Sequence, residues 1–399
     1  MDDRLIVIFG AGKIGRSFIG QVFGMEGYRV IFIDTDAALV NELNRRGEYP
    51  VVIKGPHREQ RIIIKNAAAI HAGDTDRVKE VVRDAGIMAV SVGKNALPLV
   101  APVVAAGLVQ REASSPGRTL DIILAENMRD AAPFFRERLK EHLPESYPLD
   151  SLVGLVETSI GKMVPIMSAA DMAKDPLQVF AEPYNTLILD RKGFRGKIPP
   201  IGAFALKDNM KAWVDRKAFI HNLGHASAAY RGHLKFPGAV YMYEVLADPG
   251  VYEFTRSVMQ ESARVLLEIH PGEFTGESLE AHIEDLLERF RNRSLGDTVF
   301  RVGCDLGRKL GRDDRFMGII RLAQQADKPL DQILDAMSMG FCFRGVDENG
   351  RMYPADEEFH REWEKDQEGV LERVCGLNPS GDSLLVNRIM DQYNALKQD

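Results

Sequence analysis

The sequence is poor in cysteine. Its 399 residues include three cysteines, Cys304, Cys342 and Cys375, and no two of them form a Cys-x-x-Cys pair. An odd number of widely separated cysteines is not the pattern of a disulfide framework or of a cysteine metal site, so small stapled folds are excluded. Unpaired cysteines are typical of a reducing compartment, and we therefore expect a cytoplasmic protein.

Long apolar runs and an excess of positive charge are also missing. The longest apolar stretch, residues 97–109, contains Pro98 and Pro102 and is too short to cross a bilayer. Asp2 and Asp3 precede the first apolar run, which is the wrong order for a signal peptide. The 51 Lys and Arg against 58 Asp and Glu give a formal net charge of -7. This balance argues against nucleic acid or an anionic membrane as the main partner, and a small molecule is expected instead.

Short apolar runs alternate with amphipathic segments over roughly the first 160 residues. Each run is rich in Ile and Val and apolar at consecutive positions, as expected of parallel strands covered on both faces. The pattern predicts an α/β class domain with a Rossmann-type doubly wound sheet. The runs are residues 5–9, 29–34, 86–92, 121–127 and 152–157. Between the second and third runs, two apolar segments flank the turn-like residues 55–60, which predicts an inserted hairpin.

The pattern changes at residues 191–202, where two prolines and three glycines interrupt any regular element. We place the domain boundary here, with a cofactor-binding domain at 1–195 and a substrate-binding and catalytic domain at 196–399. Helical spacing of apolar residues makes the second domain mainly α-helical. The helices are predicted at residues 208–232, 251–269, 278–293, 315–326, 330–341, 355–373 and 382–397.

The first run leads directly into Gly10-Ala11-Gly12-Lys13-Ile14-Gly15, a Gly-x-Gly-x-x-Gly motif between a strand and a helix. Such a motif gives a tight turn, close approach of the backbone to a pyrophosphate, and close packing of helix on strand. The next run ends in Asp34, whose carboxylate suits the ribose hydroxyls of NAD and repels the 2′-phosphate of NADP. NAD is therefore the predicted cofactor. The predicted cofactor-binding residues are Phe9, Gly10, Ala11, Gly12, Lys13, Ile14, Gly15, Asp34, Ser91 and Gly93. The alternative is that the glycines only shape a turn and Asp34 caps the following helix.

The second half contains an unusual helical segment with Lys217, His221, Asn222 and His225. At 3.6 residues per turn these four side chains share one broad face. Either this face is a reaction site or it is solvated. His221 and His225 also have the spacing of a helical zinc pair, but Asn222 stands where zinc hydrolases of this pattern have a glutamate base, so the hydrolase interpretation fails.

The spacing Lys217-x4-Asn222-x2-His225 resembles the signature of the polyol-specific long-chain dehydrogenases. Residues 9–20, 126–128, 208–230 and 301–315 carry the resemblance along the whole chain. It is greatest to the branch of that family that acts on mannitol 1-phosphate. The resemblance implies an NAD-dependent, metal-independent oxidoreductase that interconverts a sugar alcohol phosphate and its keto sugar phosphate, here mannitol 1-phosphate and fructose 6-phosphate.

The same resemblance assigns roles to the site residues. Lys217 would be the general acid/base, and Asn127 and Asn222 would donate amide hydrogen bonds to the substrate oxygen. His225 would orient the substrate hydroxyl, and Lys309 and Arg315 would bind substrate. Three alternatives stay open: a hexuronate or non-phosphorylated polyol oxidoreductase, a zinc enzyme using His221 and His225, and a regulatory protein that senses NAD without catalysis.

Overall fold

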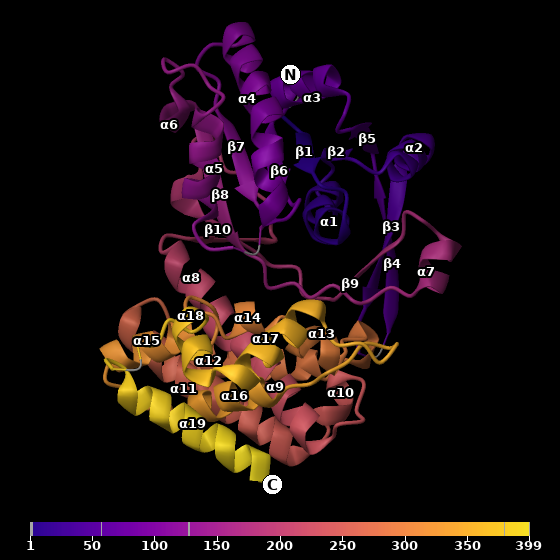
Figure 1. Ribbon diagram of the computed structural model, residues 1–399. Coiled ribbons are helices and arrows are strands. Elements are labelled where there is room, and N and C mark those ends of the chain that lie inside the picture. Colours follow the sequence, from indigo (N-terminus) through magenta and orange to yellow (C-terminus); the bar gives the residue numbers. More distant parts are fainter. Residues whose placement is uncertain (1–2, 57, 127, 379, 399) are drawn as a thin grey trace. The chain divides into compact units, whose positions relative to one another are not determined.

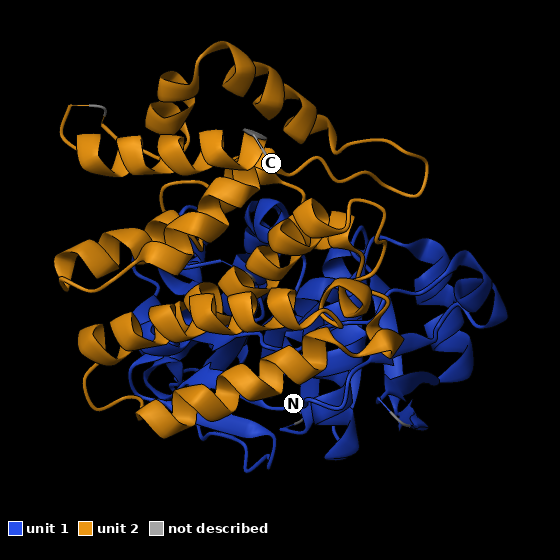
Figure 2. Cartoon of the chain, turned by 90° about the horizontal axis from the view of Figure 1, so that it is seen from below, with its two compact units in different colours: residues 1–214 blue, residues 215–399 orange. Residues whose placement is uncertain are grey.

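The computed structural model describes residues 3–56, 58–126, 128–378 and 380–398 (Figure 1). The chain divides into two compact units, residues 1–214 and 215–399 (Figure 2). The division falls later than the expected boundary at residue 195, for two reasons. The buried carboxylate of Asp121 accepts hydrogen bonds from the Arg195 and Gly196 amides. The segment after them then adds a strand at 204–207 to the sheet of the first unit.

The first unit is built on an eight-stranded sheet in the order β11-β10-β8-β7-β6-β1-β2-β5. Strands β5, β2, β1, β6, β7 and β8 are parallel to one another, β10 is antiparallel to β8, and β11 is parallel to β10. The six parallel strands have the order of a dinucleotide-binding Rossmann sheet, which confirms the predicted fold. The strands are β1 (Leu5–Phe9), β2 (Arg29–Asp34), β5 (Ala67–His71), β6 (Ile87–Val90), β7 (Leu120–Leu124), β8 (Val153–Ser159), β10 (Leu187–Asp190) and β11 (Phe204–Lys207).

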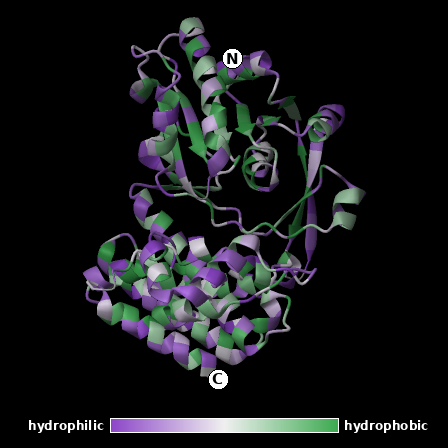
Figure 3. Cartoon of the chain, in the orientation of Figure 1, coloured by the Kyte–Doolittle hydropathy of each residue, from purple (hydrophilic) through white to green (hydrophobic). Residues whose placement is uncertain are grey.

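Both faces of this sheet are buried, as consecutive apolar positions predict. On β1, Ile6 and Ile8 belong to one core cluster, whereas Leu5, Val7 and Phe9 belong to a second cluster on the opposite face. The central strands are accordingly hydrophobic along their length (Figure 3). The helices of the unit are η1 (Gly15–Gly20, a π-helix), α1 (Gln21–Met25), α2 (Ala37–Arg46), α3 (Thr75–Asp84), η2 (Lys94–Ala96), α4 (Leu97–Ser114), α5 (Ala131–Lys140), α6 (Leu149–Leu152), α7 (Ala169–Lys174), η3 (Arg191–Gly193) and α8 (Met210–Arg216).

The predicted hairpin is present as β3 (Glu48–Lys54) and β4 (Glu59–Lys65), which pair in antiparallel register. A third strand that the sequence pattern missed, β9 (Val179–Ala181), pairs in parallel with β3. The three strands form a separate small sheet in the order β4-β3-β9.

The apolar stretch expected at residues 97–109 lies within a longer helical segment, residues 94–114. By length and composition alone this segment could cross a membrane. One face of this helix is nevertheless fully buried in the core of the first unit, including Ala101, Val104 and Leu108. Burial of this face identifies a core helix.

The second unit is helical, as predicted. Its central helix α9 packs against α10, α11, α13 and α16. The predicted helix at 355–373 is two helices, because the chain breaks at Asp366, which caps the second one. The elements are η4 (Lys217–Asn222), α9 (Leu223–Lys235), α10 (Met242–Val245), α11 (Pro249–Ile269), α12 (Gly276–Phe290), η5 (Arg293–Leu295), α13 (Val299–Gly303), α14 (Leu306–Lys309), α15 (Met317–Gln325), α16 (Asp331–Cys342), α17 (Pro354–Lys365), α18 (Gln367–Arg373) and α19 (Ser383–Gln398). The three cysteines of the chain are free thiols.

Candidate active site

The glycine motif lies where the strand order of the sheet reverses. Strands β1 and β6 are neighbours, and Gly10 and Ser91 directly follow them at their carboxyl ends. Gly10 has a φ of +94°, and a Cβ atom there would lie 2.5 Å from the Ser91 carbonyl oxygen. A Cβ atom on Gly15 would lie 2.0 Å from the Gly10 carbonyl oxygen. Packing within the protein therefore requires glycine at positions 10 and 15.

Gly12 differs from these two glycines. It is exposed, its φ is not in the left-handed region, and a Cβ atom there would meet no protein atom within 4 Å. Neither packing nor backbone conformation in the described chain explains a glycine here. Close approach of a ligand to the backbone does explain it, and this is the place where a Rossmann fold receives a pyrophosphate. The motif thus fits a dinucleotide.

Asp34 ends β2 beside the glycine motif. Its Oδ2 accepts a hydrogen bond of 2.6 Å from the Ala11 amide, and its Oδ1 accepts one of 3.0 Å from the Asp36 amide. The helix that follows is capped by the Asp36 side chain, which accepts from Ala38 and Leu39. The alternative in which Asp34 is that helix cap is therefore wrong.

The remaining predicted cofactor residues surround the same turn. Phe9 is buried, and its carbonyl accepts hydrogen bonds from the amide and the hydroxyl of Ser91. Ile14 is partly buried against the core, whereas Lys13 and Gly93 are exposed. The amide of Gly93 donates 3.0 Å to Glu126 Oε1.

Two residues of this region were missed by sequence reasoning. Buried Glu126 holds the turn after β6, because its Oε1 accepts from both the Val92 and Gly93 amides. Arg16 is 9% exposed and donates from Nε to the Ala11 carbonyl at 2.6 Å and from Nη1 to the Leu177 carbonyl at 2.7 Å. The sequence did offer a signal for both residues, because each is a charged residue directly next to an apolar segment. A charged side chain in such a place is rarely buried unless it has a partner.

In the second unit, residues 217–222 form a π-helix rather than the α-helix that the sequence suggests. The Leu223 amide bonds to the Ala218 carbonyl, five residues back, instead of the Phe219 carbonyl four residues back. The Phe219 carbonyl accepts from the buried Ser262 hydroxyl on α11 at 2.6 Å. Short π-helical turns are rare and are frequent at functional sites. The prediction of 3.6 residues per turn is therefore wrong between Lys217 and Asn222.

Lys217 opens this π-helical segment and is half-buried. Burial and, to a lesser extent, the positive charge of Arg315 lower the pKa of its ammonium, Asp314 acts in the opposite direction, and the net pKa is about 8. About one tenth of the side chain is then a neutral amine at pH 7, far more than for an ordinary lysine, and a general base requires this neutral form.

The two histidines lie against Phe290 at the end of α12. The His225 ring stacks on Phe290 with 4.3 Å between ring centroids and 5° between planes, and the His221 and His225 centroids are 6.3 Å apart. Burial lowers the pKa of both histidines well below the ordinary value, so both are neutral at pH 7. His225 Nε2 lies 3.6 Å from Oδ2 of the buried Asp297, which also pairs with Arg301. Sequence reasoning missed Asp297, because it is distant in the chain.

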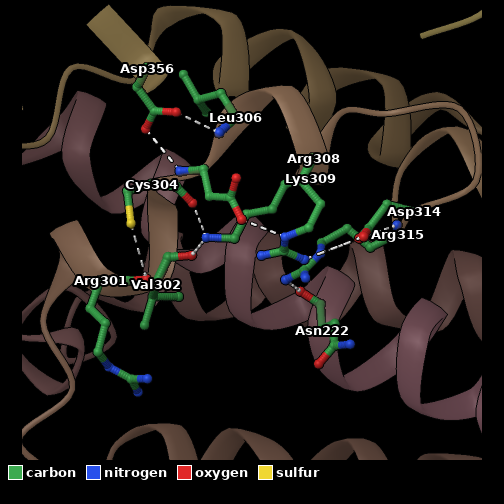
Figure 4. Close-up of polar contacts among 11 residues, drawn as sticks. Asn222, Arg301, Val302, Cys304, Leu306, Arg308, Lys309, Asp314, Arg315 and Asp356 are labelled. Atoms are coloured by element: carbon green, nitrogen blue, oxygen red, sulfur yellow. Dashed lines mark hydrogen bonds and ion pairs between the residues drawn. The ribbon is translucent and has the colours of Figure 1, made fainter. Parts of the chain in front are cut away.

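Lys309 and Arg315 are both buried, at 5% and 8% exposure, and are therefore not ordinary surface charges. Lys309 Nζ donates to the carbonyls of Val302, at 2.7 Å, and of Cys304 (Figure 4). Burial lowers the pKa of Lys309 to about 7. Arg315 Nη1 donates to the Asn222 carbonyl at 3.1 Å, so the structure brings Arg315 to the predicted catalytic segment.

Asn127, predicted as a second amide donor, lies outside the described residues. Among the residues that the structure describes, no group of three or more His, Cys, Asp or Glu side chains is arranged to hold a metal ion.

Comparison with known protein families identifies the family of this chain. The mannitol dehydrogenase Rossmann domain matches residues 4–203, and the mannitol dehydrogenase C-terminal domain matches residues 209–396. The chain belongs to the mannitol dehydrogenase family. Similar members are the mannitol-1-phosphate 5-dehydrogenases of Bacillus pumilus, 32% identical over 94% of this chain and 96% of that protein, and of Bacillus subtilis, 31% identical over 92% and 94%.

Solved structures of the same fold agree with the family assignment. The Pseudomonas fluorescens mannitol 2-dehydrogenase, solved as a ternary complex with NAD and D-mannitol, aligns with a TM-score of 0.78 at 17% identity and covers 98% of this chain and 91% of its own. A substrate-free D-sorbitol dehydrogenase aligns with a TM-score of 0.81 at 17% identity, over 98% and 93%. At this identity the likeness concerns the fold of the family, and the site residues rest on the geometry above.

Proposed function

We propose that this member of the mannitol dehydrogenase family is an NAD-dependent oxidoreductase of the cytoplasm that interconverts mannitol 1-phosphate and fructose 6-phosphate. The observation that carries this proposal is the similarity, over almost the whole of both chains, to relatives named mannitol-1-phosphate 5-dehydrogenase. The half-buried Lys217, in one segment with Asn222 and His225, supports the reaction class.

The cofactor is assigned to the first unit. The backbone at Gly10, Ala11 and Gly12 would hold the pyrophosphate, and the carboxylate of Asp34 would accept hydrogen bonds from the ribose hydroxyls. The Ala11 and Asp36 amides already fix that carboxylate in place. When bound, NAD supplies the acceptor for the hydride that leaves the substrate carbon.

The proton chemistry is assigned to the second unit. The neutral amine of Lys217 accepts the hydroxyl proton during oxidation of the polyol, and the ammonium returns it during reduction of the ketone. The side-chain amide of Asn222 donates a hydrogen bond to the same oxygen and stabilises the negative charge that develops there. His225, neutral and stacked on Phe290, orients the substrate hydroxyl.

Lys309 contributes a substrate contact in this proposal. An ammonium has three donors, and two of those on Lys309 bond to the Val302 and Cys304 carbonyls. In the protonated form, which predominates below the pKa of about 7, the third donor would serve a substrate oxygen. Lysine and amide groups supply the polarisation here, so the proposed mechanism uses no metal ion.

A substrate panel tests the proposal. NADH formation would be followed at saturating NAD with mannitol 1-phosphate, mannitol, altronate and mannonate. We expect the highest kcat/KM with mannitol 1-phosphate. Equal turnover of mannitol would favour a non-phosphorylated polyol as substrate, and turnover of the hexonates alone would favour a hexuronate oxidoreductase.

The same assay tests the sensor alternative, and metal analysis tests the zinc alternative. A protein that binds NAD but oxidises none of these compounds would be a sensor rather than an enzyme. Stoichiometric zinc retained through chelation would overturn the metal-free mechanism.

A further inference from the structure

Arg315 is directed at the main chain of the π-helical segment. Its Nη1 donates to the Asn222 carbonyl at 3.1 Å, and its Nε donates to Asp314 Oδ1 at 2.9 Å (Figure 4). The side-chain amide of Asn222 points away from Arg315 in the same view. Arg315 therefore binds the backbone carbonyl of Asn222, and the side-chain amide of Asn222 does not contact Arg315 in this view.

The backbone that Arg315 binds has an unusual shape. In a π-helix residues five apart lie one turn apart, which places Lys217 and Asn222 in successive turns. Side chains from outside the helix bind two carbonyls of this segment, since Ser262 donates to Phe219 and Arg315 donates to Asn222. External hydrogen bonds of this kind stabilise a turn that is otherwise less favourable than an α-helix.

Arg315 is itself held in place by a chain of ion pairs with Asp314, Arg308 and Asp305, which hydrogen bonds connect to Asp356. Asp314 Oδ2 lies 3.4 Å from Arg308 Nη1, and Arg308 in turn pairs with Asp305. The amides of Asp305 and Leu306 donate to the buried carboxylate of Asp356 at the start of α17. Contacts within the fold are thus sufficient to set the position of the guanidinium.

We propose that Arg315 is a positioning residue for the dehydrogenase reaction: its hydrogen bond to the Asn222 carbonyl holds the π-helical turn that carries Lys217 and Asn222. This role differs from the substrate contact that the sequence suggests for Arg315. It rests on the proposed function, because it concerns the general base of that reaction.

The charges around Lys217 support this role. Arg315 and Asp314 act on its pKa in opposite directions, the first lowering it and the second raising it. On the same segment His221 is neutral because burial lowers its pKa, and the positive charges of Arg289 on α12 and of Lys217 lower it as well. Asp215, just before the segment, pairs with His270 at 2.9 Å.

Four variants test the inference. Arg315→Gln removes both the charge and the Asn222 hydrogen bond, Arg315→Lys keeps the charge, and Asp314→Asn removes the opposing charge. Arg312→Gln is the matched control, since Arg312 is an exposed arginine in the same loop. Each variant would be measured for the pH dependence of kcat/KM with mannitol 1-phosphate and NAD. The pH dependence of Lys217 acetylation by acetic anhydride would be followed by mass spectrometry without substrate or NAD.

We expect Arg315→Gln to raise the apparent pKa of Lys217 by about 1 unit in both measurements, and Asp314→Asn to lower it. Arg315→Lys should leave that pKa nearly unchanged and lower kcat about tenfold with little change in KM, because the turn is no longer held. Arg312→Gln should change neither. If Arg315→Gln does not fold, the Arg315→Lys and Asp314→Asn variants decide the matter by the same two readouts.

Two results would overturn the inference. An unchanged acetylation profile in Arg315→Gln and Asp314→Asn would remove the electrostatic role, and a rise in KM alone for Arg315→Lys would make Arg315 a substrate ligand. Absence of turnover in the parent protein would instead defeat the proposed function, and the acetylation measurement would still judge the role of Arg315.

Discussion

The Ala11 amide donates a hydrogen bond of 2.6 Å to the carboxylate of Asp34. This bond joins the glycine turn after β1 to the end of β2, so the carboxylate fixes the turn; in the proposed function it also provides the negative charge that selects a free ribose hydroxyl. The two functions of Asp34 can be separated by experiment.

Replacing Asp34 with Asn keeps an acceptor for the Ala11 amide and removes the negative charge. We expect NADH affinity to fall about tenfold, and NADPH affinity to rise relative to NADH because the repulsion of a 2′-phosphate is lost. Fluorescence titration with both cofactors measures this. Equal losses for both would mean that Asp34 acts only on the fold.

Alanine at Gly15 should lower the stability of the first unit, whereas alanine at Gly12 should weaken cofactor binding. A Cβ atom at Gly15 would overlap the Gly10 carbonyl at 2.0 Å, so Gly15→Ala should destabilise the first unit by about 1–3 kcal/mol. A Cβ atom at Gly12 meets no protein atom within 4 Å, so Gly12→Ala should have the same unfolding temperature as the parent protein but should bind NADH more weakly. Thermal unfolding and NADH titration on both variants are the measurements. Unchanged NADH binding by Gly12→Ala would move the cofactor away from this turn.

Loss of the Lys217 amine should abolish proton transfer without affecting the cofactor. We expect Lys217→Ala to lower kcat by about 10²–10⁴-fold while the Kd for NADH stays within about twofold of the parent. Lys211→Ala, an exposed lysine on the preceding helix α8, is the control and should retain full rate. A Lys217→Ala protein with parental turnover would end the general-base assignment.

The pH dependence should reveal the lowered pKa of Lys217. Oxidation needs the neutral amine, so kcat/KM for mannitol 1-phosphate should rise with pH and level off above the pKa of about 8. Reduction of fructose 6-phosphate needs the ammonium and should fall over the same range. Lys309, with a pKa of about 7, is the competing group. Lys309→Met separates the two groups. If this variant shifts the inflection of the kcat/KM profile, and the pKa from Lys217 acetylation differs from that inflection, then the inflection reports Lys309.

The first unit was predictable in outline because buried parallel strands leave consecutive apolar residues in the sequence. Strands β1, β2, β6, β7 and β8 correspond to the five predicted runs. The pattern missed β5 (Ala67–His71), since a run of alanines lacks the β-branched side chains that mark a strand. It also missed β9, β10 and β11, which have three or four residues each and are too short to show a period.

The candidate site was predictable where neighbours in the chain are neighbours in space. Gly10, Gly12, Gly15 and Asp34 meet because a glycine turn and the next strand end are brought together by every sheet of this topology. The partners of the second-unit residues lie far away in the chain, as Asp297 does from His225 and Ser262 from Phe219. The π-helical turn was also hidden, because its formation depends on those tertiary partners rather than on local propensity.

The π-helical turn decides the angle between Lys217 and Asn222. In an α-helix each residue turns the side chain by about 100°, so five residues of α-helix would place these two side chains about 140° apart. In the π-helical turn residues five apart lie about one turn apart, so the two residues come to the same side of the segment. Deletion of Ala218 would leave them four residues apart, about one turn of an α-helix, and should therefore remove the wide turn without moving Lys217 to another face.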